Sequence, residues 1–172
     1  MTDGPTFTQE YTLVRTYDAP PEMVFASWTT PEHFSRWFGP RALETPVDLI
    51  TMDVRPGGVW EASIVTPDGT AHPLNGTYRE VNVPSRLVLT TGDPNNTEGA
   101  VASVVTIDFD AIDEGTRMRF HQAGVNTDEA HAAGAKAGWI EFFERLGEHL
   151  KQLQSDTTRT ETSSAEHLTG GE

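Results

Sequence analysis

Apolar and polar positions alternate along most of the chain, the pattern of half-buried β-strands. The first such stretch covers residues 7–17, and six more follow at 47–54, 59–66, 75–83, 86–91, 102–112 and 116–122. Short turns separate several of them, such as Arg-Pro-Gly-Gly at 55–58 and Pro-Asp-Gly-Thr at 67–70. Consecutive strands joined by short turns predict an antiparallel meander.

Helical spacing of apolar residues appears in three places. Prolines at 21 and 31 begin two short helices after the first strand, and Gly39-Pro40 ends the second. Near the C-terminus, a stripe at i, i+3, i+4, i+7 and i+11 predicts one long helix: Trp139, Phe142, Phe143, Leu146 and Leu150. Residues 130–138 before it are mostly alanine and glycine. Small residues there either leave space beneath the helix or let the helix and sheet approach closely.

The composition changes near Gln154. Residues 155–172 contain one large aliphatic side chain, Leu168, and no aromatic one, so they are predicted to form a disordered acidic tail behind a single domain at 1–154. Within the domain, the order is strand, helix pair, meander and long helix. It predicts an α+β helix-grip fold, with a curved antiparallel sheet of about six to seven strands wrapped around the C-terminal helix.

Four segments of the chain resemble one known family. They are RTYDAPPEMVFASWTTPEHFSRWFGP (15–40), DVRPGGVWEASIVTPDG (53–69), LNGTYREVNVPSRLVLT (74–90) and GWIEFFERLGEHL (138–150). In this order they resemble the START-like SRPBCC superfamily, in the subgroup similar to the C-terminal domain of the heat-shock-protein-90 ATPase activator. The resemblance covers residues 7–153. It implies a mostly apolar cavity between sheet and long helix, where superfamily members bind lipids, sterols and polyketides and some cyclise or hydrolyse them.

Charge and composition narrow the choice of partners. With 172 residues, 36% of them apolar, the chain is sized for one domain with a real core. Its net charge of −14 comes without a basic patch, which disfavours nucleic acid and anionic lipid. No apolar run approaches the ~20 residues that span a bilayer, so membrane insertion is not expected. The absence of cysteine and of a signal-peptide pattern at the N-terminus predicts a cytoplasmic protein.

The candidate ligand-binding residues are large and apolar, because small-molecule pockets are mostly lined by such side chains. They are Trp28, Phe34, Trp37, Phe38, Trp60, Tyr78, Met118, Phe120, Trp139, Phe142 and Phe143. The alternative is that the same residues fill an ordinary core. A filled core would admit no ligand, so the sequence leaves both interpretations open.

Candidates for acid–base chemistry are fewer. His121 and His72 could exchange a proton near neutral pH. Alternation places Met118 and Phe120 on one face of their strand and His121 on the other, toward solvent, and no partner group can be assigned from spacing. Catalytic residues therefore stay unknown. No metal-ligand spacing or nucleotide loop is present, so neither a metal nor a cofactor is expected.

Three functions are compatible with these observations. The favoured one is a non-catalytic protein that binds a hydrophobic small molecule. The second is a cyclase, dehydratase or hydrolase of aromatic or polyketide-like compounds, which a buried acid or histidine beside a tyrosine in the cavity would favour. The third is regulation of a chaperone ATPase. It is disfavoured because the chaperone activator has a separate N-terminal domain for which this sequence has no room. A homodimer is left open.

Overall fold

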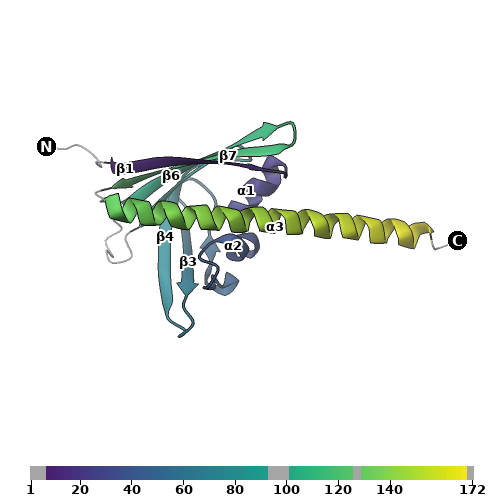
Figure 1. Cartoon of the computed structure of the whole chain (residues 1–172), viewed down its shortest axis with the longest axis horizontal. Helices are drawn as coiled ribbons and strands as arrows, with labels where there is room; N and C mark the ends of the chain where they lie inside the picture. Colours follow the sequence, from purple (N-terminus) through teal and green to yellow (C-terminus); the bar gives the residue numbers. More distant parts are fainter. Residues whose placement is uncertain (1–6, 93–100, 126–128, 170–172) are drawn as a thin grey trace.

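The computed structural model describes residues 7–92, 101–125 and 129–169. In chain order its elements are β1 (Phe7–Tyr17), α1 (Pro21–Thr29), α2 (Pro31–Trp37), the 3₁₀ turn η1 (Val47–Leu49), β2 (Thr51–Met52), β3 (Val59–Val65), β4 (Ala71–Asn82), β5 (Arg86–Gly92), β6 (Val101–Ile112), β7 (Gly115–Val125) and α3 (Glu129–Thr169) (Figure 1). The predicted order of a strand, two short helices, further strands and a long helix is confirmed.

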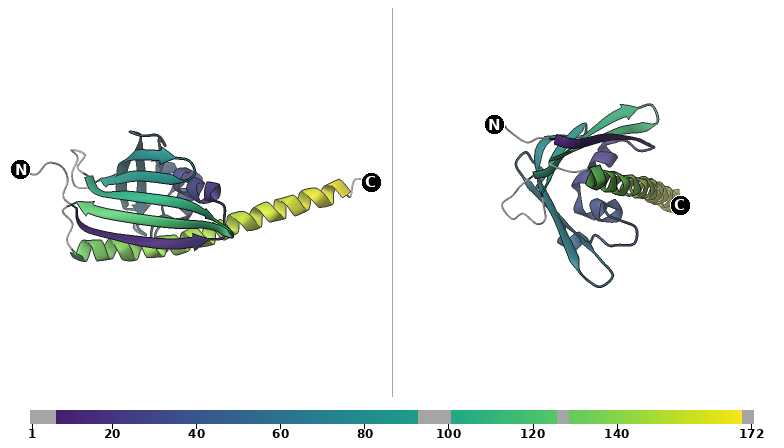
Figure 2. Two further views of the ribbon diagram at one scale, coloured as in Figure 1. Left: turned by 90° about the horizontal axis from the view of Figure 1, so that it is seen from above. Right: turned by 60° about the vertical axis from the view of Figure 1, so that its left-hand side comes forward.

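The seven strands form one antiparallel sheet in the order β1-β7-β6-β5-β4-β3-β2. The sheet bends around α3, and α1 and α2 lie on the same side of it as α3 (Figure 2). Among the described strands, one pairing joins partners distant in the chain, that of β1 with β7, in which Leu13 lies opposite Phe120. Both side chains are buried beneath α3, because alternation turns every second residue of these strands inward. The predicted helix-grip fold is confirmed.

One predicted strand is wrong. Residues 47–54 form the turn η1 followed by the two-residue strand β2. Leu49 N–H donates to the carbonyl of Pro46 at 3.0 Å, and Ile50 N–H donates to that of Val47 at 3.1 Å, which closes the turn. Val47 and Leu49 are 39% and 45% exposed and Ile50 is buried. The apolar residues at positions 47 and 49 are exposed to solvent, and their spacing of two residues therefore resembled that of a strand.

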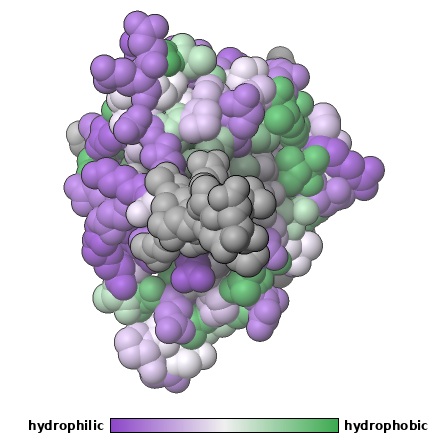
Figure 3. All heavy atoms as spheres, turned by 90° about the vertical axis from the view of Figure 1, so that its right-hand side faces the viewer, coloured by the Kyte–Doolittle hydropathy of each residue, from purple (hydrophilic) through white to green (hydrophobic). Residues whose placement is uncertain are grey.

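Helix α3 confirms its predicted apolar stripe and extends beyond it. Phe143, Leu146 and Leu150 are buried against the rest of the domain. The helix then continues to Thr169 and projects past the end of the sheet (Figures 1 and 2). That residues 155–172 are disordered stays a prediction; in the structure, α3 includes this segment as far as Thr169. On the face toward which α3 points, hydrophilic residues predominate and hydrophobic ones form small groups (Figure 3). No helix in the described part of the chain is long and apolar enough to cross a membrane.

Candidate functional site

A cavity of about 330 Å³ lies between α3 and the inner face of the sheet. Trp28 of α1, Phe34 of α2 and Phe38 just after α2 form one wall. Trp139 and Phe142 of α3 form another, and strands β2 to β5 and β7 supply the rest. The lining residues are Trp28, Phe34, Phe38, Met52, Trp60, Ile64, Leu74, Asn75, Tyr78, Leu89, Thr91, Gln122, Gly134, Ala135, Gly138, Trp139 and Phe142. Most of this surface is aromatic or aliphatic, the composition expected of a small-molecule pocket.

The predicted ligand-binding residues divide into two groups. Seven line the cavity: Trp28, Phe34, Phe38, Trp60, Tyr78, Trp139 and Phe142. The other four, Trp37, Met118, Phe120 and Phe143, are at most 1% exposed and pack behind the wall. The ring centroids of Trp37 and Trp28 are 4.8 Å apart, and those of Phe120 and Trp139 are 4.7 Å apart. The structure thus places seven of these residues at a cavity and four in the packed core behind it.

Small residues of α3 leave the space open. A Cβ atom built on Gly134 meets no atom within 4 Å, and one on Gly138 meets only Cζ of Phe142, at 3.7 Å. Both glycines line the cavity. At these two positions of the segment 130–138, the small residues therefore leave open space beneath the helix. No backbone approaches them closely, so the alternative of close packing does not apply there.

Gly76 has the opposite role. The indole Nε1 of Trp60 donates to the carbonyl of Thr90 at 2.9 Å, passing directly over β4. A Cβ atom on Gly76 would lie 1.7 Å from that carbonyl oxygen and 2.5 Å from Nε1. Only glycine fits there, and the hydrogen bond fixes the Trp60 ring in the cavity wall.

One end of the cavity is polar. There a row of side chains crosses four strands: Tyr11 of β1, Gln122 of β7, Ser103 of β6 and Thr91 of β5. The Tyr11 hydroxyl donates to Oε1 of Gln122, and Nε2 of Gln122 donates to Oγ of Ser103 at 2.9 Å. Oγ of Ser103 lies 2.6 Å from Oγ1 of Thr91. Gln122 and Thr91 both face the cavity.

The described lining contains no Asp, Glu, His, Lys or Arg. Burial raises the pKa of the one ionisable lining residue, Tyr78, so that its hydroxyl stays protonated near neutral pH. Elsewhere in the described chain no three His, Asp or Glu side chains come together as a metal site would require. The arrangement is therefore equipped to bind an apolar molecule and to hydrogen-bond it, without a charged group at hand.

The polar residues that the sequence offered for chemistry lie outside the cavity. His121 points outward as predicted, with Nδ1 2.9 Å from Oγ1 of Thr12 and Nε2 3.2 Å from a carboxylate oxygen of Glu10. His72 is exposed on β4. At the end of the β2–β3 hairpin, Arg55 and Asp53 form an ion pair, with 2.8 Å between Arg55 Nε and Asp53 Oδ2.

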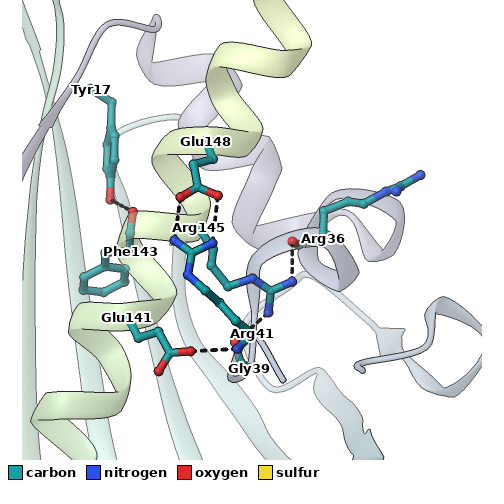
Figure 4. A network of polar contacts seen from close by, with 8 residues as sticks. All are labelled: Tyr17, Arg36, Gly39, Arg41, Glu141, Phe143, Arg145 and Glu148. Carbon is teal, nitrogen blue, oxygen red and sulfur yellow. Dashed lines mark hydrogen bonds and ion pairs between the residues drawn. The ribbon is translucent and has the colours of Figure 1, made fainter. Parts of the chain in front are cut away.

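A polar network holds α3 against the end of α2 (Figure 4). The guanidinium group of Arg145 donates to the carbonyl oxygens of Gly39 at 2.6 Å and Arg36 at 3.0 Å. The carbonyl of Arg36 belongs to the last turn of α2, where the helix offers no donors of its own, and Gly39 lies just beyond the helix. Arg41 pairs with Glu148 through both terminal nitrogens, one of them at 2.9 Å. The network fixes α3 one to two turns beyond Phe142 and so sets the height of the helix above the cavity.

Sequence reasoning missed the polar row, although a signal for it exists. On β7 the inward positions read Met118, Phe120, Gln122, and on β5 they read Leu87, Leu89, Thr91. A polar residue therefore ends an inward apolar series on each strand. The strand register that brings these ends together depends on pairing between β5, β6 and β7, which the alternation of one strand does not specify.

Comparisons with known proteins agree with this architecture. Residues 18–151 match the profile of the family described as Activator of Hsp90 ATPase homolog 1-like protein. No curated protein matches the chain. A crystal structure of a protein from Nitrosomonas europaea is 28% identical, with a TM-score of 0.72 over 83% of this chain and 94% of that one. The AHSA1 protein from Silicibacter pomeroyi is 21% identical, with a TM-score of 0.72 over 84% of this chain and 99% of its own.

Proposed function

The chain belongs to the family of Activator of Hsp90 ATPase homolog 1-like proteins, and we propose that within this family it binds a hydrophobic small molecule in the cavity beneath α3. The observation that carries the proposal is the combination of an aromatic wall with two glycines that leave about 330 Å³ open. A protein that needed only a core would gain from filling this space, since buried apolar area and dispersion contacts stabilise the fold.

The lining supports binding over catalysis. The enzyme alternative was tied to an acid or histidine beside a tyrosine in the cavity. Tyr78 is present, but among the described lining residues it has no such neighbour. General acid–base catalysis near neutral pH requires a group whose pKa lies near the working pH, and burial moves the pKa of Tyr78 further away from it.

Tryptophan fluorescence tests the proposal directly. Trp139 lines the cavity, and its ring centroid is 5.8 Å from that of Trp28. Titration with fatty acids, flavonoids and polycyclic aromatics should give a saturable change in emission with at least one class. Trp139→Phe should remove most of that change. Trp37→Phe is the matched control, because Trp37 lies behind the wall, and it should leave the change in place.

Native mass spectrometry of freshly purified protein provides a second measurement. A ligand retained from the cell would appear as a discrete added mass that is lost on denaturation. If no compound in the panel gives a saturable response and no such mass is found, the proposed binding function is refuted and only the fold remains.

A further inference from the structure

We propose that the cavity selects an uncharged ligand that presents a hydrogen-bond acceptor, such as a ketone, aldehyde, ester or lactone oxygen, to the Thr91–Gln122 end. This inference rests on the proposed function and specifies its ligand class. It follows from the direction of the hydrogen bonds in the polar row and from the charge of the cavity lining.

The direction of the row is set at its β1 end. A neutral tyrosine hydroxyl that donates to Oε1 of Gln122 fixes the amide orientation, so Nε2 is the atom that faces Ser103. Ser103 Oγ then accepts from Nε2. Ser103 is 5% exposed, and its Oγ lies 2.6 Å from Oγ1 of Thr91, a pair in which either hydroxyl can donate. We assign the proton to Ser103, because its Oγ already accepts from Nε2 of Gln122 and Thr91 faces the cavity. Gln122 and Ser103 then each accept from one neighbour in the row and donate to the next, an arrangement in which neighbouring hydrogen bonds strengthen one another.

The groups left over at the cavity are donors. With Oγ1 of Thr91 occupied as an acceptor, its hydroxyl proton is available for a ligand. An amide nitrogen carries two protons, and within the described structure Nε2 of Gln122 uses one of them, on Ser103. Trp28, in the opposite wall formed by the helices, also lines the cavity, and its indole N–H is buried without a hydrogen-bond partner among the described residues. A buried donor without an acceptor is unfavourable, and an acceptor oxygen on a bound molecule would relieve that cost.

The charge of the ligand follows from the lining. A carboxylate brought into this cavity would lose its hydration, and the described lining offers no lysine, arginine or histidine to compensate. A neutral carbonyl oxygen needs only the donors. Asn75 is exposed at the rim and carries both a donor and an acceptor, so it does not change the preference at the buried end.

Three naphthalene probes of nearly equal shape test the inference: 2-acetylnaphthalene, 2-ethylnaphthalene and 2-naphthoate. Binding is measured by calorimetry at neutral pH. We expect 2-acetylnaphthalene to bind about tenfold more tightly than 2-ethylnaphthalene, which is the net effect of one hydrogen bond. The anion 2-naphthoate should bind more weakly than the ketone.

Variants of Thr91 assign the effect to the row. Thr91→Val keeps the shape of the side chain and removes the hydroxyl. It should reduce ketone binding about tenfold and leave 2-ethylnaphthalene unchanged. Thr91→Ser keeps the hydroxyl and should retain the preference for the ketone. Because Thr91→Ser is conservative, the pair remains informative even if Thr91→Val folds poorly.

The outcomes separate this inference from the function on which it rests. If 2-ethylnaphthalene and 2-acetylnaphthalene bind equally, the cavity binds apolar molecules but the acceptor preference is wrong. The preference is also wrong if the ketone binds more tightly and Thr91→Val retains that difference, or if 2-naphthoate binds best. If none of the three probes binds and the wider panel also fails, it is the binding function itself that is refuted.

Discussion

Gly138 of α3 allows stability and ligand binding to be separated by a single substitution. Glycine in a helix interior costs about 1 kcal/mol relative to alanine. A Cβ atom at this position meets only Cζ of Phe142, at an ordinary contact distance of 3.7 Å. Gly138→Ala should therefore raise the free energy of unfolding by up to about 1 kcal/mol, a rise in Tm of roughly 2–4 °C for a protein of this size.

Gly138→Leu extends the experiment to binding. Leucine has a helix propensity close to that of alanine, so the backbone gain is retained. Its side chain, however, enters space that the proposed ligand occupies, beside Phe142. We expect a fold at least as stable as the natural one and affinity for 2-acetylnaphthalene reduced by tenfold or more. A variant that binds less while melting higher cannot owe its defect to unfolding.

Gly147 is the matched control within the same helix. Its Cβ position lies 3.4 Å from a ring carbon of Tyr17, away from the cavity lining. Gly147→Ala should leave binding unchanged. Thermal denaturation followed by far-ultraviolet circular dichroism, and calorimetric titration, measure the two quantities. A lower Tm for Gly138→Ala would show that α3 packs closely there, and unchanged binding by Gly138→Leu would place the ligand elsewhere.

Three further predictions concern the surroundings of the site. Burial first, and then the charges of His33 and Arg36, lower the pKa of His149 to about 4. In the unfolded chain the pKa of this histidine is about 6.5, so the unfolded state binds the proton more readily. The free energy of unfolding should therefore fall as the pH drops from about 6.5 to about 4. Urea denaturation at several pH values should show a shallower fall for His149→Gln, and an identical fall would contradict this assignment. Arg145→Met removes the donors to the carbonyl groups at the end of α2 and should destabilise by about 1.5–3 kcal/mol in the same assay, whereas a loss below about 0.5 kcal/mol would show that the network is unimportant. Removing residues 155–172, of which α3 includes those up to Thr169 and projects past the sheet in Figure 1, should change the free energy of unfolding by no more than about 0.5 kcal/mol. A Tm drop of several degrees would show that this segment is docked.

The fold could be predicted because its signals are local. Alternation, the prolines that begin α1 and α2, and the stripe from Trp139 to Leu150 each depend on a few neighbouring residues. The same local evidence failed at residues 47–49, where the hydrogen bonds of a 3₁₀ turn and exposure to solvent decided the structure. Hydrophobic periodicity carries no information on whether an apolar side chain finds a partner to pack against.

The site was predictable only in part. Large aromatic residues pointed to seven lining positions, because such residues face inward in nearly any arrangement of these elements. Whether a given ring lines the cavity or stands behind it depends on packing depth: Trp28 and Trp37 differ in this respect although both are buried. The polar row depends on the register of four paired strands, and the sequence of a single strand does not determine how that strand aligns with its neighbours.

The order of the strands also has a kinetic consequence. Five of the six pairings between the described strands join neighbours in the chain. In contrast, β1 must find β7 across about a hundred residues, since Tyr17 pairs with Thr116. Closing a loop tenfold longer costs about 2 kcal/mol more in chain entropy. The meander from β2 to β7 can therefore form first, and docking of β1 follows.

The helices α1 and α2 follow β1 directly and complete the aromatic wall, so the cavity should assemble in the late step. Leu13→Ala in β1 would then accelerate unfolding while leaving the folding rate nearly unchanged. The cavity is expected to be the last part of the molecule to form and the first to come apart.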